Sequence, residues 1–158
     1  MINIRHSIFE TNSSSVHALV IPKDTQIYIP KKVNLYGGDY GWSEGIEDDT
    51  INYFYQACLD QGKEEVEKFF AYLRKKGVEE INAKEMRWDE EGYDMTNDGY
   101  IDHAYEIPLD ELFKNEQLLD RFLFGSDSYV HTGNDNNGTE EWAEDIDEEA
   151  NDVIWKGN

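Results

Sequence analysis

Residues 9–17 read Phe9-Glu10-Thr11-Asn12-Ser13-Ser14-Ser15-Val16-His17. This polar stretch lies between two apolar runs, residues 2–9 and 16–21, and contains neither glycine nor proline. It offers one carboxylate, one amide, four hydroxyls and one imidazole. It is either a binding or catalytic loop between two buried strands, or a polar turn whose side chains hydrogen-bond their own backbone. The flanking runs predict strands over residues 1–9 and 16–21.

The residues that follow predict more strands and then two helices. Apolar alternation indicates strands over residues 25–29 and 33–36. Apolar residues then recur at helical spacing over about residues 47–61 and again over about residues 63–76, and a glycine follows each run. The short connection between them predicts an antiparallel pair of helices packed on the sheet.

The second half of the chain alternates short elements with polar loops. Strands are predicted over residues 78–81, 128–132 and 153–155. A helix is predicted after Pro108, and an acidic helix over residues 140–150.

The whole chain, residues 1–158, is therefore predicted to form a single α+β domain. We expect a mostly antiparallel sheet, two central amphipathic helices and an acidic C-terminal helical part that begins at about residue 89. Residues 1–88 carry a net charge of −3, and residues 89–158 carry −18 of the total −21. A surface of this sign does not bind DNA, RNA or anionic lipid directly, so the expected partner is basic.

The sequence lacks the features of membrane insertion and secretion. It has no apolar run long enough to span a membrane, and its N-terminus has no basic segment followed by an apolar core. Cys58 is the single cysteine, which excludes an internal disulfide and fits a reducing compartment. We therefore expect a cytoplasmic protein.

Arg5, Ser7 and the string from Phe9 to Ser15 with His17 resemble the opening of a family of small proteins from phages and Gram-positive bacteria. Later segments fit the same resemblance: Gly41-Trp42, Tyr100-Ile101-Asp102-His103, Phe122-Leu123-Phe124 and Thr132-Gly133-Asn134-Asp135-Asn136. The resemblance implies a setting in bacterial mobile elements and implies no reaction.

Residues 94–102 have the alternating oxygen groups of a calcium-binding loop, and the candidate ligands are Asp94, Thr96, Asp98 and Asp102. Such loops usually place a bidentate glutamate at the twelfth position. Here Tyr105 takes that position and Glu106 follows one residue later. A calcium-stabilised protein and a solvated acidic turn both remain open, and no other cofactor is predicted.

A site built on the serine-rich stretch is a further hypothesis. Asp102-His103 would supply an acid and a base to a serine nucleophile, and we expect residues 10–17 to lie near residues 94–103. No Gly-x-Ser-x-Gly nucleophile elbow is present, and no two histidines have the helical spacing of a zinc site. The candidate residues for catalysis or ligand binding are Ser13, Ser14, Ser15, His17, Asp102 and His103.

Other polar side chains are candidates for a ligand-binding loop: Glu10, Asn12, Asn134, Asp135 and Asn136. Turn chemistry alone also explains the asparagine-rich run before Gly138.

The acidic helix predicted over residues 140–150 would expose its carboxylates and bury Trp142 and Ile146 on one apolar face. Successive helical turns are about 5.4 Å apart, which is close to the phosphate spacing along one nucleic-acid strand. This pattern fits a mimic of the phosphate backbone, although a solvated surface gives the same pattern. The candidate binding residues are Glu140, Glu141, Glu144, Asp145, Asp147, Glu148 and Glu149.

These observations favour a non-enzymatic, phage-type inhibitor that occupies the basic groove of a host defence protein, such as a CRISPR or restriction nuclease. The alternative is an enzyme, or a protein that binds a small molecule or nucleotide, with the serine-rich stretch and Asp102-His103 as its site. Charge changes in residues 140–150 should affect only the inhibitor. Changes at His17 or Asp102 should affect only the alternative.

Overall fold

The computed structural model describes residues 15–41, 43–134 and 139–156, apart from the side chains of residues 139 and 140. The strand predicted over residues 1–9 lies outside this part of the chain. Within it, helices and an antiparallel sheet confirm the predicted α+β class.

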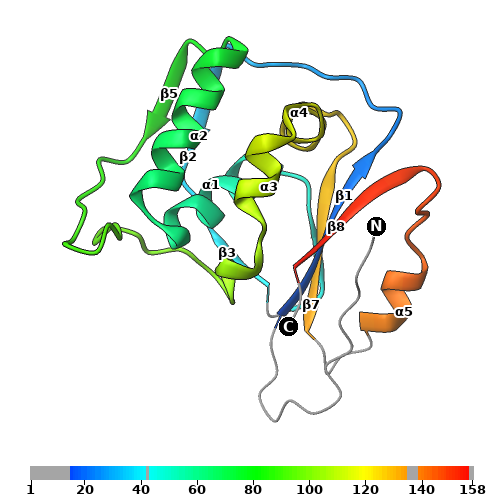
Figure 1. Ribbon diagram of the computed structural model, residues 1–158. Coiled ribbons are helices and arrows are strands. Elements are labelled where there is room, and N and C mark those ends of the chain that lie inside the picture. Colours follow the sequence, from blue (N-terminus) through cyan, green and yellow to red (C-terminus); the bar gives the residue numbers. More distant parts are fainter. Residues whose placement is uncertain (1–14, 42, 135–138, 157–158) are drawn as a thin grey trace.

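A four-stranded antiparallel sheet in the order β4-β7-β1-β8 runs through the molecule (Figure 1). Its strands are β1 (Ser15–Pro22), β4 (Gly45–Glu47), β7 (Tyr129–Asn134) and β8 (Asn151–Lys156). The register of β1 places His17 opposite Thr132 of β7 and opposite Lys156 of β8. Strand β1 therefore lies between two partners that come from the far end of the chain.

Both faces of β1 are covered, which explains its continuous apolar run. Leu19 and Ile21 pack into the main core with the helices. Ala18 and Val20 pack into a second cluster with α5 (Thr139–Glu144) on the opposite face (Figure 1). A strand buried on both faces loses the alternation of polar and apolar residues that marks a half-exposed strand.

The helices on the main face are α1 (Thr50–Gln61), α2 (Lys63–Lys76), α3 (Leu109–Lys114) and α4 (Glu116–Phe124). Helix α1 begins later than predicted because the Asp49 side chain accepts the Asn52 N–H at 3.1 Å and caps it. Helix α2 has the predicted bounds and ends at Gly77, whose φ of 106° suits glycine. In the described part of the chain, none of the helices has the length and apolar character needed to cross a membrane.

Two small parallel pairs flank the helices. Strand β2 (Lys32–Leu35) pairs with β5 (Glu80–Ala83), and β3 (Asp39–Tyr40) pairs with β6 (Tyr100–Ile101). The prediction of a strand over residues 25–29 was wrong. In this stretch only Ile27 forms a β-bridge, to Gly125. The nearby prolines cannot donate to a ladder, which limits pairing in this stretch.

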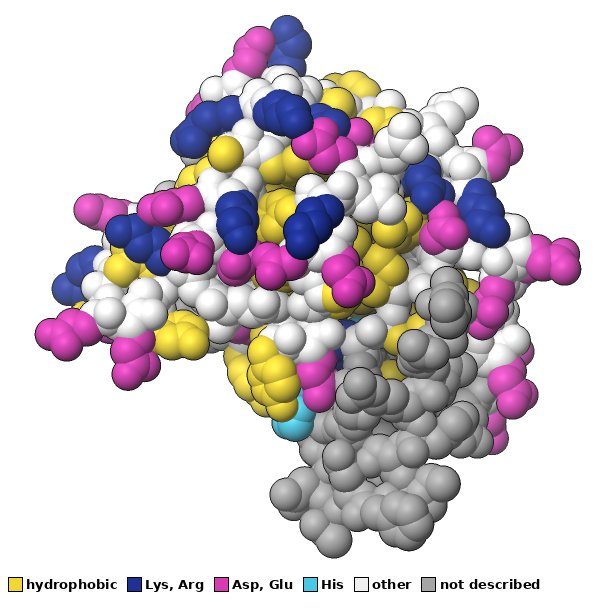
Figure 2. All heavy atoms as spheres, viewed as in Figure 1, with side chains coloured by type: hydrophobic (Ala, Val, Ile, Leu, Met, Phe, Trp, Pro, Cys, Tyr) yellow, Lys and Arg dark blue, Asp and Glu magenta, His cyan; other side chains and the backbone are white. Residues whose placement is uncertain are grey.

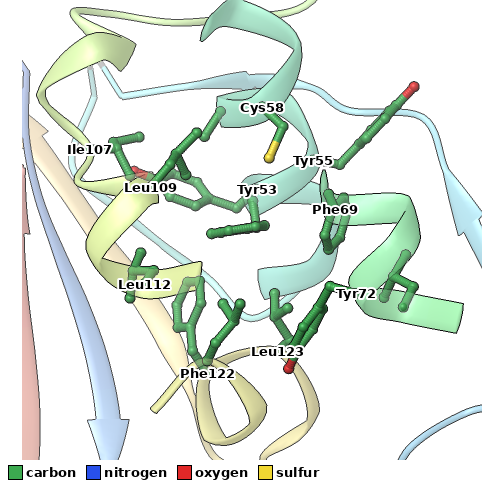
Figure 3. Close-up of a cluster of buried hydrophobic side chains, with 14 of the residues drawn as sticks. Tyr53, Tyr55, Cys58, Phe69, Tyr72, Ile107, Leu109, Leu112, Phe122 and Leu123 are labelled. Atoms are coloured by element: carbon green, nitrogen blue, oxygen red, sulfur yellow. The ribbon is translucent and has the colours of Figure 1, made fainter. Parts of the chain in front are cut away.

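The main core joins the four helices through aromatic and aliphatic side chains. Figure 3 shows Cys58 of α1, Phe69 of α2, Leu112 of α3 and Phe122 of α4 around one interior. Phe54 of α1 meets the Phe69 ring edge-to-face, with a centroid distance of 5.1 Å. Burial raises the pKa of the Cys58 thiol well above its usual value, so this side chain is a core residue.

The acidic helix is shorter than predicted, because α5 ends at Glu144 instead of residue 150. Asp147 Oδ1 accepts the N–H groups of Glu149 and Ala150 at 3.0 Å and 3.3 Å, which forms a turn leading into β8. The placement of all candidate carboxylates on one helix was therefore wrong. Those of Asp145, Asp147, Glu148 and Glu149 lie in the turns that follow α5.

Candidate functional site

A polar stripe on α1 holds two neighbouring backbone segments. Asn52 Oδ1 accepts the N–H groups of Tyr36 and Gly37 at 2.8 Å and 3.0 Å. Asp60, two turns further along, accepts the Ile101 N–H at 2.8 Å through Oδ2. The hydrogen bond to Asp60 fixes the chain just before Asp102 and so positions its carboxylate.

A group of polar side chains, the polar cluster, fills the space between this segment and the ends of β1 and β8. Its members are Ser15, His17, Tyr53, Asp102, Glu106 and Lys156. Ser15, His17, Tyr53 and Lys156 are fully buried, and the two carboxylates are half-buried. Buried polar groups need hydrogen-bond partners, and the contacts of the cluster supply most of them, although His17 Nε2 and Glu106 Oε2 have no hydrogen-bond partner among the described residues.

Ser15 is hydrogen-bonded through both its backbone and its side chain. Its N–H donates to Asp102 Oδ2 at 2.9 Å, and its hydroxyl lies 3.3 Å from the Asp102 carbonyl oxygen. Lys156 Nζ donates to the Ser15 carbonyl oxygen and to Ser15 Oγ, both at 2.7 Å. Lys156 Nζ also lies 4.0 Å from Glu106 Oε2. The cluster therefore joins residues from both ends of the described chain.

His17 is held neutral inside the cluster. Its Nδ1 lies 2.6 Å from the Tyr53 hydroxyl, which donates when the ring proton is on Nε2. Burial lowers the pKa of His17 to about 3, and the nearby positive charge of Lys156 acts in the same direction. Gly41, with a φ of 120°, brings backbone against the imidazole where a Cβ would overlap Nε2.

Asp102, in contrast, stays ionised because hydrogen bonds to its carboxylate outweigh the effect of burial. Burial alone raises its pKa, but hydrogen bonds from the Ser15 N–H and the Tyr100 hydroxyl outweigh that effect and hold the pKa below its usual value. The Tyr100 hydroxyl lies 2.7 Å from Asp102 Oδ1. One carboxylate oxygen thus faces the polar cluster and the other faces Tyr100.

The expected proximity of residues 10–17 to residues 94–103 is found at Ser15 and Asp102. Ser15 does not form the proposed serine–histidine–aspartate triad. In the described part of the chain, its hydroxyl is hydrogen-bonded to Lys156 and to the Asp102 carbonyl oxygen, and not to the imidazole of His17 or His103. The His103 ring instead stacks on Tyr105 with centroids 5.6 Å apart. Ser13 and Ser14 lie outside the described residues.

Two of the four candidate calcium ligands, Asp94 and Thr96, are hydrogen-bonded to each other, and Asp102 is bonded to Ser15 and Tyr100. Asp94 Oδ1 accepts the N–H groups of Arg87 and Thr96 at 3.0 Å and 2.9 Å. The Asp98 side chain is 89% exposed, and its Oδ2 lies 4.0 Å from Lys84 Nζ. Among the described residues, no three His, Cys, Asp or Glu side chains are grouped to hold a metal ion. Calcium binding stays a prediction.

Of the candidate ligand-loop residues, Asn134 is described and Glu10, Asn12, Asp135 and Asn136 lie outside the described residues. Asn134 ends β7 and pairs with Ser15 in the register of the sheet. It is buried, so it belongs to the interior near the polar cluster.

The acidic segment, residues 141–149, forms a second candidate site on the other face of the sheet. Its exposed carboxylates are those of Glu141, Glu144, Asp145, Asp147, Glu148 and Glu149. No lysine or arginine occurs in the sequence between Arg121 and Lys156. Along the lower right edge of Figure 2, where Figure 1 places α5, acidic side chains gather without basic ones.

Apolar side chains fix this segment to the sheet. Trp142 and Ile146 pack against Val20 and Val153 in the second hydrophobic cluster. The Trp142 ring stacks on His131 with centroids 4.0 Å apart. Gly133 leaves room for the indole, because a Cβ there would lie 3.1 Å from Trp142 Nε1. The carboxylates are therefore displayed on an anchored backbone.

Sequence reasoning missed three members of the polar cluster: Tyr53, Glu106 and Lys156. Tyr53 reads as an ordinary core residue of an amphipathic helix. The available signal for Lys156 was its place as the sole basic residue after Arg121, directly beside the apolar run of the last strand.

No family model matches the chain, and no curated protein or solved structure is significantly similar to it.

Proposed function

We propose that the protein is a non-enzymatic, phage-type inhibitor that acts in the bacterial cytoplasm. Its acidic segment would occupy the basic nucleic-acid-binding groove of a host defence protein, such as a CRISPR or restriction nuclease. The observation that carries the proposal is the set of exposed carboxylates on residues 141–149, to which the neighbouring sequence contributes no lysine or arginine.

The energetics support a role in binding. Like charges held close together repel one another and destabilise the compact state. A basic groove relieves that repulsion, and both surfaces release their counterions when they meet. Around α2 and α4 the chain mixes the two signs, as where Lys76 lies 2.8 Å from Asp120 and 3.2 Å from Glu116. The contrast makes the acidic segment the natural contact for a basic partner.

The polar cluster supports a non-enzymatic role. Ser15 Oγ is fully buried, and both Lys156 Nζ and the Asp102 carbonyl oxygen lie within hydrogen-bond distance of it. A nucleophile must reach its substrate, and this hydroxyl is taken up by structural contacts. The cluster therefore fits a role in joining β1 to β8.

The test compares two variants that remove the same number of charges. The acidic variant carries E141Q, E144Q, D145N, E148Q and E149Q, and it keeps Asp147 because that side chain forms the turn. The control variant changes exposed acids on the helical side: E64Q, E67Q, E79Q, E80Q and D110N. Binding to a panel of purified CRISPR and restriction nucleases is measured by calorimetry at several salt concentrations, with cleavage assays in parallel.

We expect the parent and the control variant to bind one of these nucleases and to compete with its nucleic acid. Affinity should fall steeply with salt, since charges supply most of the attraction. The acidic variant should bind about tenfold or more weakly, equivalent to about 1.4 kcal/mol. Equal inhibition by the acidic variant, or inhibition of none of the nucleases by the parent, contradicts the proposal.

A further inference from the structure

A surface cavity of about 540 Å³ lies beside Asp102. It opens between the C-terminal end of α1 and residues 100–105, and Tyr93 completes its wall. Its size is within the range of about 300–1,000 Å³ that is typical of ligand sites. The cavity is separate from the acidic segment.

Exposed aromatic rings gather around this cavity. Tyr93, Tyr100 and Tyr105 line it and are 46%, 55% and 72% exposed. Single exposed rings are common on protein surfaces, but several around one hollow indicate a binding surface. The faces of these rings are electron-rich and attract cations.

The charged groups of the cavity wall are mainly acidic. Asp60 and Asp102 contribute carboxylates, the imidazole of His103 lies with its Nε2 3.8 Å from Asp102 Oδ1, and no lysine or arginine of the described residues lines the wall. Hydrogen bonds keep the pKa of Asp102 low, so this carboxylate is ionised. Among the described residues, Tyr100 donates a hydrogen bond to Asp102 Oδ1, and a carboxylate oxygen has capacity for a second.

Hydrogen bonds from α1 hold the cavity wall in place. Gln61 Nε2 donates to the carbonyl oxygens of Ala104 and Ile107 at 2.8 Å and 3.1 Å. Asp60 accepts the Ile101 N–H on the other side. A site formed before its ligand arrives loses less entropy on binding.

We propose that this cavity binds a guanidinium group, presented as an arginine side chain of a partner protein. A planar guanidinium stacks on tyrosine rings through its face and donates to a carboxylate through its edge, which suits the tyrosines and Asp102 together. An ammonium group lacks the planar face, so arginine fits this wall better than lysine. The inference does not depend on the function proposed for the acidic segment.

The test titrates the full chain with N-acetyl-arginine amide and follows backbone amide shifts by NMR. N-acetyl-citrulline amide has nearly the same shape without the charge, and N-acetyl-lysine amide has the charge without the plane. We expect the arginine probe to shift the amides of residues 100–105 with a dissociation constant that is about millimolar. The citrulline probe should bind about tenfold more weakly, and the lysine probe should lie between the two.

Three variants locate the site. Tyr93→Ala and Tyr105→Ala should each weaken binding of the arginine probe by about fivefold. Tyr28→Ala is the matched control, because Tyr28 is 77% exposed and does not line the cavity. Equal binding of the citrulline probe, equal behaviour of all three variants, or shifts confined to the acidic segment would each overturn the proposal.

Discussion

Lys156 Nζ lies 2.7 Å from both the carbonyl oxygen and the hydroxyl oxygen of Ser15, so a residue near the end of the chain holds the start of β1. The amine is fully buried and lies 4.0 Å from the Glu106 carboxylate. A buried charge is tolerated only with partners that replace water. This contact therefore joins β8, β1 and the segment after β6 at one point.

Replacing Lys156 with methionine should destabilise the fold strongly. The change keeps most of the side-chain volume but leaves the two acceptors of Ser15 without their donor and the Glu106 carboxylate without the nearby positive charge. We expect the free energy of unfolding to fall by about 3 kcal/mol, measured by urea denaturation. Lys114→Met, at an exposed position, should change it by less than about 0.5 kcal/mol. Similar losses of unfolding free energy in the two variants would show that the buried contacts of Lys156 do not stabilise the fold.

Gly41 and Gly45 offer a matched pair of glycine substitutions. A Cβ at Gly41 would overlap His17 Nε2, and the φ of 120° is unfavourable for alanine. Gly41→Ala should therefore cost about 2 kcal/mol or more in thermal or urea unfolding. At Gly45 the nearest atom to an added Cβ is Thr132 Oγ1 at 3.6 Å, an ordinary contact. Gly45→Ala should change stability by less than about 1 kcal/mol, and equal costs would contradict the packing of Gly41 on His17.

Local signals predicted the helices of the first half well. Helix α2 has acids in its first turn, bases in its last turn and a glycine after it, and all of these act within the helix itself. The predicted bounds of the acidic helix were wrong because the chain must turn back to the sheet, which ends the helix at Glu144. The turn at Asp147 returns the chain to β8, and nothing in the helical pattern of residues 140–150 signals where β8 must begin.

The candidate site was predicted in part for a similar reason. Ser15 and Asp102 were both marked by unusual polarity, and the structure joins them. The position of Lys156 in the polar cluster depends on the strand register, which places it opposite His17. That register is set by pairing between strands that are far apart in the sequence. Sequence spacing alone could not place an amine from β8 on a serine of β1.

Removing charge from the acidic segment should stabilise the protein at low salt. The exposed carboxylates of residues 141–149 repel one another, and the variant with E141Q, E144Q, D145N, E148Q and E149Q removes five of them. We expect a gain of about 1 kcal/mol in the free energy of unfolding at low ionic strength. The gain should shrink at about 1 M salt, where the Debye screening length is about 3 Å and the repulsion between exposed charges is largely screened. A gain that does not change with salt would point to helix propensity or packing instead of repulsion.

The last prediction concerns the buried imidazole of His17. Its folded-state pKa is about 3, below the ordinary value of 6.5, because burial opposes the charged form. Below pH 6.5 the unfolded chain takes up a proton that the folded protein does not, so stability is complete above that pH and is lost as pH falls toward 3. Between pH 7 and pH 5 this group alone should lower the free energy of unfolding by about 2 kcal/mol.

His17→Gln removes this titration while the other charged groups remain. The stability difference between the parent and His17→Gln should therefore shrink by about 2 kcal/mol between pH 7 and pH 5, as measured by urea denaturation. Direct NMR of the parent gives an independent check, because the His17 ring signals should stay at neutral-form positions at pH 5. A ring that titrates near pH 6.5 would mean that water reaches His17, and that the Tyr53 and Gly41 contacts do not seal the polar cluster.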